Sequence, residues 1–288
     1  MSLPDGYFEL NGVKFGDWEP IVPIGFTPGP ANITTSDINN PFYDEVYAGR
    51  DLLHGETWTF ELLIHGPSEA FVLEQLGRLE RMWKDRRRRT AAGELSELHY
   101  GWGGRTRVVY GRPRRFARQV TGLTVQREAR VTCEFEVMDA LHYDRTWQSV
   151  TLRMVPPEIR GLSSPLREED LTTLAGGKRM GQIDYVGGDG DTPILIDIHG
   201  PCVNPEVTFA GRRLRWDLTV REGQRLQVDT RRGYARLAGR SVVSSMGRKS
   251  RLKDIRIGAG KHEVSFKAVD PSMTSYARFW WRPAHYGF

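Results

Sequence analysis

The sequence predicts a mostly β protein, and three observations support this prediction. Apolar and polar residues alternate with a period of two in many short segments, which places one face of each strand in a core and the other in water. Turn-forming pairs such as Asn11-Gly12, Glu222-Gly223 and Arg232-Gly233 separate these segments. One segment shows the periodicity of an α-helix instead. Many short strands with regular turns are typical of β-sandwiches and β-barrels.

Length and composition limit the class of protein. The chain has 288 residues, which suffices for two ordinary domains or one large β domain. Apolar residues make up 39% of the chain and charged residues 27%, so there is material for a core and no compositional sign of disorder. The formal net charge of +5 permits nucleic-acid binding but does not argue for it.

The cysteines and the N-terminus bear on where the protein is made. Cys133 and Cys202 are too few for a disulfide framework or, alone, for a zinc site. The first ten residues, MSLPDGYFEL, lack the charged and apolar regions of a signal peptide. No apolar run approaches the ~18–20 residues that span a bilayer. We therefore expect synthesis in a reducing cytoplasm and no membrane partner.

The first strong strand signal covers residues 57–65, and a helix signal follows it. Four apolar residues alternate with polar ones in this strand: Trp58, Phe60, Leu62 and Ile64. The next four apolar residues have the i, i+4, i+7 and i+11 spacing of one helical stripe: Val72, Leu76, Leu79 and Trp83. Ser68 is a suitable N-cap. The sequence therefore predicts one helix at about residues 68–88, flanking the strands.

The end of this segment is the most charged stretch of the chain. Lys84 and Arg86 to Arg89 supply five positive charges against the single carboxylate of Asp85. A nucleic-acid site and the solvated end of a helix are the two interpretations. A helix C-terminus favours positive charge by roughly 0.3–1 kcal/mol, and no aromatic residues interleave with the arginines as they do on a single-strand platform. We favour the helix end.

A domain border is expected within residues 139–156. This divides the chain into a first domain at 1–144 and a second at 145–288. Residues 156–193 contain four prolines and two Gly-Gly pairs, which predicts a loop-rich connection.

The second domain continues the alternation at residues 214–220, 262–268 and 277–281. In the last run Trp281 falls on the core side and Trp280 on the other face. We predict Trp280 to be an exposed interface or glycan contact.

Motifs for catalysis or cofactor binding are weak. Asp139, His142 and Asp144 offer three metal ligands within six residues, but nothing else in the sequence completes a coordination shell. The glycine- and aspartate-rich stretch at 187–191 lacks the spacing of a calcium loop and the Lys of a phosphate loop. No nucleophile motif is present. We expect no metal, no cofactor and no enzymatic activity.

The N-terminal half resembles the distal tail (Dit) proteins of long-tailed, non-contractile bacteriophages. FELNGVKFGD (8–17) is similar to the family's opening strand and turn, after which a long variable loop follows. GRDLLHGETWTFELLIHG (49–66) is similar to the family's lead into a strand. VTCEFEVMDALHYD (131–144) resembles the close of the family's ring domain, with Ala140 in place of the usual proline.

The C-terminal half carries the more specific part of the resemblance. Four segments follow the order and spacing of the family: GDTPILIDIHGPCVNPEVTF (190–209), LTVREGQRLQVDT (218–230), LKDIRIGAGKHEVSF (252–266) and ARFWWRPAHY (277–286). Lys261 stands where the family often has an asparagine.

The resemblance implies a fold and a role. The expected fold is an N-terminal ring domain, a tail-tube-like β-barrel with a flanking helix, and a C-terminal galectin-like β-sandwich. The implied role is structural: a hexameric ring in the tail tip of the virion that joins the tail tube protein to the tape-measure protein, the hub and, in some phages, receptor-binding proteins.

Under this resemblance, DNA passes through the ring lumen without specific binding. We therefore expect Arg86, Arg87, Arg88 and Arg89 to lie away from the lumen and to contact a neighbouring subunit or partner. The alternatives are a carbohydrate-binding module that aids host attachment and, with the least support, a tail-associated hydrolase.

Overall fold

The computed structural model describes residues 2–121, 123–154, 180–209, 211–270 and 272–287. The chain forms two compact units: residues 1–145 together with 285–288, and residues 146–284. The division falls one residue from the expected border, but the last four residues belong with the first unit. No helix in the described ranges is long and apolar enough to cross a membrane. The prediction of a mostly β protein is confirmed.

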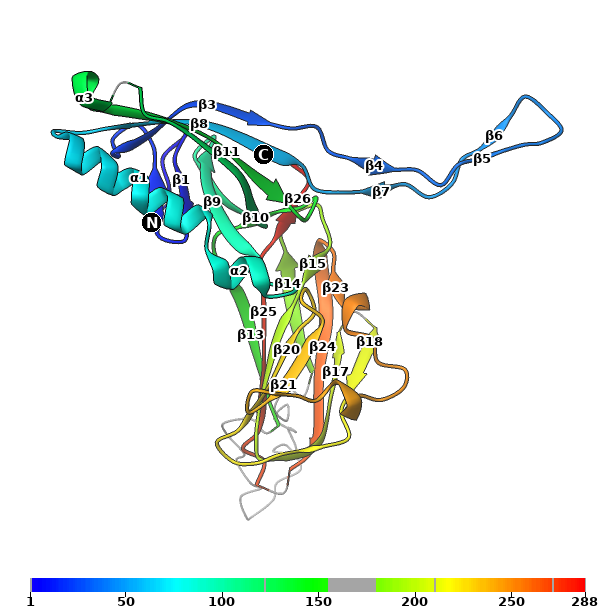
Figure 1. Cartoon of the computed structure of the whole chain (residues 1–288). Helices are drawn as coiled ribbons and strands as arrows, with labels where there is room; N and C mark the ends of the chain where they lie inside the picture. Colours follow the sequence, from blue (N-terminus) through cyan, green and yellow to red (C-terminus); the bar gives the residue numbers. More distant parts are fainter. Residues whose placement is uncertain (1, 122, 155–179, 210, 271, 288) are drawn as a thin grey trace, which may run out of the picture. The chain divides into compact units, whose positions relative to one another are not determined.

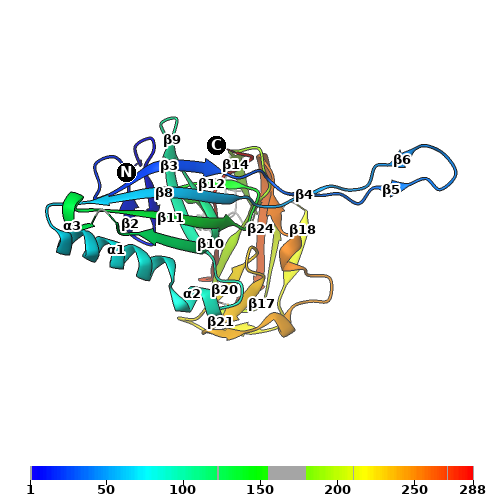
Figure 2. The same cartoon turned by 45° about the horizontal axis from the view of Figure 1, so that its top comes forward.

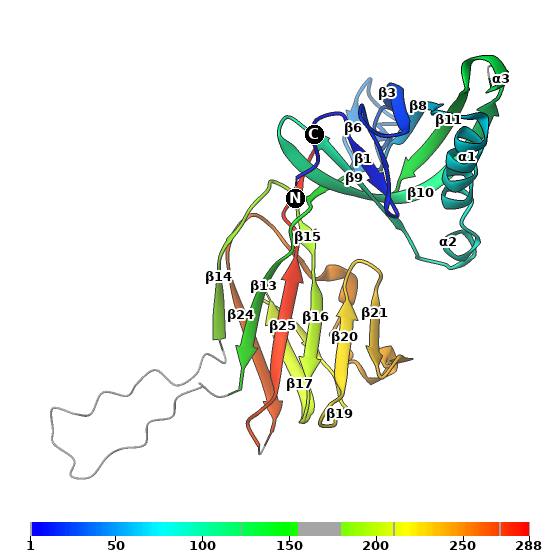
Figure 3. The ribbon, with the colours of Figure 1, turned by 90° about the vertical axis from the view of Figure 1, so that its left-hand side faces the viewer.

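Unit 1 is built on one antiparallel sheet with the strand order β2-β1-β9-β10-β11-β8-β3 (Figures 1 and 3). Its strands are β1 (Phe8–Leu10), β2 (Val13–Phe15), β3 (Ile21–Pro28), β8 (Thr57–His65), β9 (Ser96–Trp102), β10 (Arg105–Gln119) and β11 (Glu128–Val137). Two short strands extend this sheet: β12 (His142–Asp144) pairs with β10, and β26 (Ala284–His285) pairs with β12.

Helix α1 (Glu69–Trp83) covers one face of this sheet and packs on β8, β10 and β11. The helix begins as predicted, because the Ser68 hydroxyl accepts the backbone N–H of Phe71 at 3.2 Å. The four residues of the predicted stripe are all buried: Val72, Leu76, Leu79 and Trp83. They share a core with the inward-facing residues of β8. Among these, the ring of Phe60 lies 5.1–5.6 Å, centroid to centroid, from the rings of Phe8, Phe15 and Phe26.

The predicted extent of the helix, to about residue 88, is wrong. Helix α1 ends at Trp83, and a separate helix α2 (Arg86–Thr90) follows. The physical reason is Asp85, whose carboxylate accepts the backbone N–H of Arg87 at 3.0 Å and so acts as the N-cap of a new helix. The arginines are therefore not the last turn of α1. A third short helix, α3 (Leu123–Gln126), precedes β11.

A long two-stranded arm leaves the sheet between β3 and β8 (Figures 1 and 2). It comprises residues 29–56 and contains two ladders, β4 (Ile33–Thr34) with β7 (Leu52–Leu53) and β5 (Ile38–Asn39) with β6 (Val46–Tyr47). The expectation of a long variable loop after residue 17 is thus corrected: the segment holds strand β3 and this arm.

Unit 2 consists of two larger antiparallel sheets around one core. The first has the order β13-β25-β16-β20-β21-β22 and the second β14-β24-β17-β18, with β19 beside β17. The first sheet comprises β13 (Gln148–Arg153), β16 (Leu195–His199), β20 (Arg225–Asp229), β21 (Tyr234–Leu237), β22 (Arg240–Ser241) and β25 (Tyr276–Trp281). The second comprises β14 (Met180–Val186), β17 (Cys202–Phe209), β18 (Arg212–Arg215), β19 (Thr219–Val220) and β24 (Gly260–Val269).

Smaller elements complete unit 2. Strands β15 (Thr192–Pro193) and β23 (Arg256–Ile257) pair with each other, and two 3-10 turns lie at Val243–Ser245 and Leu252–Asp254. The largest fully buried side chains of the core come from both sheets and the adjoining turn: Phe209, Trp216, Phe266 and Phe279.

Two predictions for unit 2 need correction. The run at 214–220 is two strands, β18 and β19, because the chain breaks at Trp216, whose backbone N–H bonds to the carbonyl of Pro205 at 3.0 Å. Of the expected loop-rich connection at 156–193, residues 156–179 lie outside the described residues, and residues 180–186 form strand β14.

Candidate functional site

The arm exposes an unusual amount of apolar surface. All residues of its four short strands are exposed. Eight large apolar side chains are between 44% and 84% exposed: Ile33, Ile38, Phe42, Tyr43, Val46, Tyr47, Leu52 and Leu53. An isolated two-stranded hairpin is at best marginally stable in water, and contiguous exposed apolar surface marks an interaction site.

Polar contacts keep the arm a continuous ribbon. The Asp37 carboxylate accepts the backbone N–H of Gly49 at 2.7 Å, and the Ser36 hydroxyl donates to the carbonyl of Arg50 at 2.6 Å. Nearer the sheet, the backbone N–H of Gly29 donates to the carbonyl of Thr57 at 2.8 Å. The arm is therefore held in register along its length.

The tip of the arm, residues 40–45, combines aromatic and acidic side chains. Phe42 is 84% exposed and Tyr43 73% exposed. The next two residues, Asp44 and Glu45, are exposed, and their carboxylates have no hydrogen-bond or ion-pair partner within the described part of the chain. Asn40 shapes the tip, since its side-chain carbonyl accepts the backbone N–H of Phe42 at 3.0 Å.

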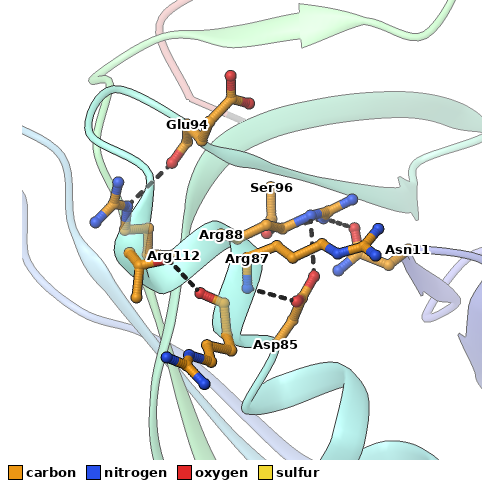
Figure 4. A network of polar contacts seen from close by, with 9 residues as sticks. Asn11, Asp85, Arg87, Arg88, Glu94, Ser96 and Arg112 are labelled. Carbon is orange, nitrogen blue, oxygen red and sulfur yellow. Dashed lines mark hydrogen bonds and ion pairs between the residues drawn. The ribbon is translucent and has the colours of Figure 1, made fainter.

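A second feature of unit 1 is the arginine-rich helix α2, shown in Figure 4. Arg88 is the centre of a polar network. Its guanidinium group donates one hydrogen bond to the side-chain carbonyl of Asn11 and another, of 3.0 Å, to the hydroxyl of Ser96. The same group lies 3.6 Å from the carboxylate of Asp85. Arg112, on β10, donates to the backbone carbonyls of Ala91 and Glu94 at 2.8 and 3.1 Å. These contacts fix α2 and the following turn onto the sheet.

A cavity of about 100 Å³ lies between the end of α1, α2 and β10; we call it the arginine pocket. Its lining is partly apolar and partly cationic: Met82, Trp83, Asp85, Arg88, Arg89, Ser96, Arg112, Pro113 and Arg114. Four of these lining residues are arginines and one is an aspartate, and Arg114 forms an ion pair with Glu136 of β11. The buried indole N–H of Trp83 has no hydrogen-bond partner in the described ranges.

The four predicted contact arginines do not act as one group. Arg88 and Arg89 line the arginine pocket, whereas Arg86 and Arg87 do not. Arg86, Arg87 and Arg89 are exposed, and their guanidinium groups have no partner within the described residues. Arg112 of β10 also lines the pocket. Only the fold brings it to α2.

Trp280 lies in β25, on the face opposite to the buried Phe279 and Trp281, as the alternation predicts. It is half-buried, and the guanidinium carbon of Arg278 lies 5.0 Å from the centre of its ring. Its role as an interface or glycan contact stays a prediction.

The three acidic and histidine residues weighed as metal ligands each have a different structural partner. Asp139 accepts the hydroxyl of Tyr143 at 2.7 Å, and Asp144 lies 3.0 Å from the ring nitrogen of His285. His142 is buried, with its Nδ1 2.5 Å from the hydroxyl of Tyr100, and burial lowers its pKa to about 4. Among the described residues, no three His, Cys, Asp or Glu side chains converge as metal ligands do.

Both thiols are buried in the cores of their units. Burial raises the pKa of Cys133 far above its usual range and that of Cys202 to about 12. Neither thiol has the thiolate character of a nucleophile.

Comparison with known proteins identifies the fold. No family model and no curated protein matches the chain in sequence. Among solved structures, it is similar to the Dit protein of phage SPP1, described as a paradigm of the hub adsorption apparatus in phages that infect Gram-positive bacteria. The TM-score is 0.56 and the identity 10%, over 95% of this chain and 97% of that one.

The phage P2 baseplate in its activated conformation supplies two further matches. The structure with Ca has a TM-score of 0.54 and 11% identity over 92% of this chain and 91% of that one; the structure with Sr has the same TM-score and identity over 91% of each. The resemblance to distal tail proteins is therefore confirmed at the level of the fold.

Proposed function

We propose that this chain is a ring-forming structural subunit of a bacteriophage tail tip, without enzymatic activity. Its likeness in fold to the SPP1 Dit protein extends over 95% of the chain and so includes both units. That protein is described as part of a hub adsorption apparatus, and the other similar chains belong to a phage baseplate. The proposed location is the tail tip of the virion.

The observation that carries this proposal is the exposed arm. The eight large apolar side chains of the arm are exposed on a hairpin that covers none of the core of its own subunit. Monomeric proteins rarely expose so much contiguous apolar surface. A neighbouring chain that packed on the arm would bury these side chains. Because the arm and the rest of unit 1 present different surfaces, the contact is heterologous, and repeated heterologous contacts close into a ring when the rotation allows. Six copies is the number that the family resemblance implies.

The proposed ring would join the tail tube protein on one side to the tape-measure protein and hub on the other, with receptor-binding proteins as possible further partners. DNA would pass through its lumen without specific binding. A strongly basic lumen would hold the DNA by its phosphates, so we place Arg86, Arg87, Arg88 and Arg89 away from it, at a contact between proteins.

Glycan binding by unit 2 is the alternative function. It would require a free aromatic face for stacking against a sugar ring. Trp280 is half-buried, and the guanidinium of Arg278 lies over its ring. This geometry favours a structural role for Trp280 over a sugar contact. Saturable binding on a glycan array that is abolished by Trp280→Ala would support the alternative.

Class averages of the purified full-length protein by negative-stain electron microscopy test the proposal. We expect closed rings with a central opening at micromolar protein concentration. Particles that stay monomeric at every concentration, together with a virion map that lacks this chain at the tail tip, would overturn it. Turbidity loss of host cell walls on addition of the protein would instead support a hydrolase.

A further inference from the structure

We infer that the arm tip of one subunit, residues 40–45, docks into the arginine pocket of the neighbouring subunit. The inference rests on the proposed ring, because it names the contact through which one copy would hold the next. It goes further than the ring proposal in assigning both sides of that contact to particular side chains of this chain.

The chemistry of the arginine pocket defines what it can bind. Its apolar lining, which includes Met82, Trp83 and Pro113, favours a ring or an aliphatic side chain. Arg112 donates hydrogen bonds to backbone carbonyls, and the guanidinium group of Arg89 has no partner within the described chain. Neither positive charge is therefore neutralised by a carboxylate. Guanidinium groups bind carboxylates with two parallel hydrogen bonds. The pocket therefore suits a segment with a carboxylate next to an apolar group.

The arm tip has this composition. Phe42 and Tyr43 are among the most exposed large apolar side chains of the described chain, and Asp44 and Glu45 follow them directly. Both carboxylates are unpaired within the described residues, so a new ion pair would break no existing one. Charge and apolar surface match on the two sides, and the complementary charges would fix the register of the contact.

The geometry of the arm assigns the contact to a second copy. Thirteen extended residues, from 29 to the tip, span about 40 Å. In Figures 1 and 2 the arm projects away from the sheet, and its tip lies far from α2 of the same chain. Because the tip lies far from its own pocket, we assign the pocket that it enters to a neighbouring copy, so that each subunit donates one tip and receives one. This is the head-to-tail arrangement that closes a ring.

Charge reversal on each side, and then on both, tests the inference. Arg89→Glu places a carboxylate in the pocket, and Glu45→Arg places a cation on the tip. Both side chains are exposed and unpaired among the described residues, so neither change should lower the free energy of unfolding measurably. Each single reversal should raise the protein concentration needed for half-maximal ring formation by about tenfold or more, because like charges then face each other at every contact. The combined variant should restore it to about the wild-type value, since every pocket again meets a tip of opposite charge.

Arg248→Glu is the matched control: it changes the net charge equally at an exposed arginine of unit 2 and should leave ring formation unchanged. The readout is the ring fraction by analytical ultracentrifugation across a concentration series. Wild-type rings that are unaffected by Arg89→Glu, or a double variant as impaired as the single ones, would overturn the docking contact and leave the ring proposal standing. A wild-type protein that never forms rings would instead overturn the proposed function.

Cysteine cross-linking provides a second test that does not depend on energetics. In the variant carrying Glu45→Cys and Arg89→Cys, oxidation should link subunits into a covalent ladder up to the size of the ring, because the two native thiols are buried. Assembled rings that yield no ladder would overturn the contact. If Arg89→Glu weakens binding to duplex DNA while leaving rings intact, the pocket is a nucleic-acid contact and the inference is also overturned.

Discussion

The arm and strand β8 follow one another in the sequence and use the same kinds of side chain, yet their surroundings are opposite. In β8, Trp58 and Phe60 are fully buried, whereas in the arm Phe42 is 84% exposed and Tyr43 73% exposed. Strand β8 has β11 and β3 on its two edges and α1 over one face. The arm has only its own two strands. The core of unit 1 is therefore complete without the arm, and the apolar surface of the arm is available to another chain.

Substitution of one phenylalanine in each region should produce the largest difference in stability. Phe60→Ala removes a ring that packs on several other aromatic rings and should lower the free energy of unfolding of unit 1 by about 3–5 kcal/mol. Phe42→Ala should change it by less than about 0.5 kcal/mol. Urea denaturation of the full chain, with hydrogen exchange to identify the unit that opens, measures both. Equal losses would show that the arm belongs to the core.

The two regions should also differ in their response to acid. Burial lowers the pKa of His142 from 6.5 to about 4, with Arg107 and His285 adding to the shift and Asp139 opposing it. The unfolded chain then takes up the proton first, so stability is full above about pH 6.5 and falls as the pH drops towards about 4. The expected loss is up to about 3 kcal/mol.

Two glutamine variants test this response. Denaturation midpoints between pH 7 and pH 4 should show a shallower decline for His142→Gln than for the wild type. His54→Gln, at an exposed histidine of the arm, is the matched control for the loss of one histidine. A wild-type slope that persists in His142→Gln would contradict the assignment.

The smallest effect concerns two serines with side-chain hydrogen bonds. Ser68→Ala removes the N-cap of α1 and should destabilise unit 1 by about 1 kcal/mol. Ser36→Ala removes a hydrogen bond within the arm and should leave the unfolding of unit 1 unchanged. The midpoint shift in the same urea experiment separates them, and a larger loss for Ser36→Ala would reverse the comparison.

Much of the buried region could be predicted from the sequence, and little of the exposed region. The alternation in β8 and the apolar stripe in α1 correctly predict which side chains are buried. Alternation in β25 likewise predicts that Trp280 lies on the face opposite to the core. The arm shows no such periodicity, because its paired segments are only two residues long and neither of its faces packs on a core. In the sequence Asp85 is the single carboxylate among five positive charges, and nothing there indicates that it caps a new helix, α2.

The arginine pocket required information that local sequence does not contain. Arg112 lies more than twenty residues from α2 in the chain, and it reaches the pocket because the turn after α2 offers it the carbonyls of Ala91 and Glu94. The signal that could have drawn attention to the arm is its aromatic and acidic tip, which has the composition of a contact surface rather than of a solvated turn.

The central claim is that the arm is needed for assembly and not for folding. Sedimentation velocity of the wild type and of Phe42→Ala, at matched micromolar concentrations and with matched unfolding midpoints, tests it most directly. We predict a ring-sized species for the wild type and predominantly monomer for Phe42→Ala. Rings of equal abundance for both proteins, or a wild type that sediments only as a monomer, would contradict the account.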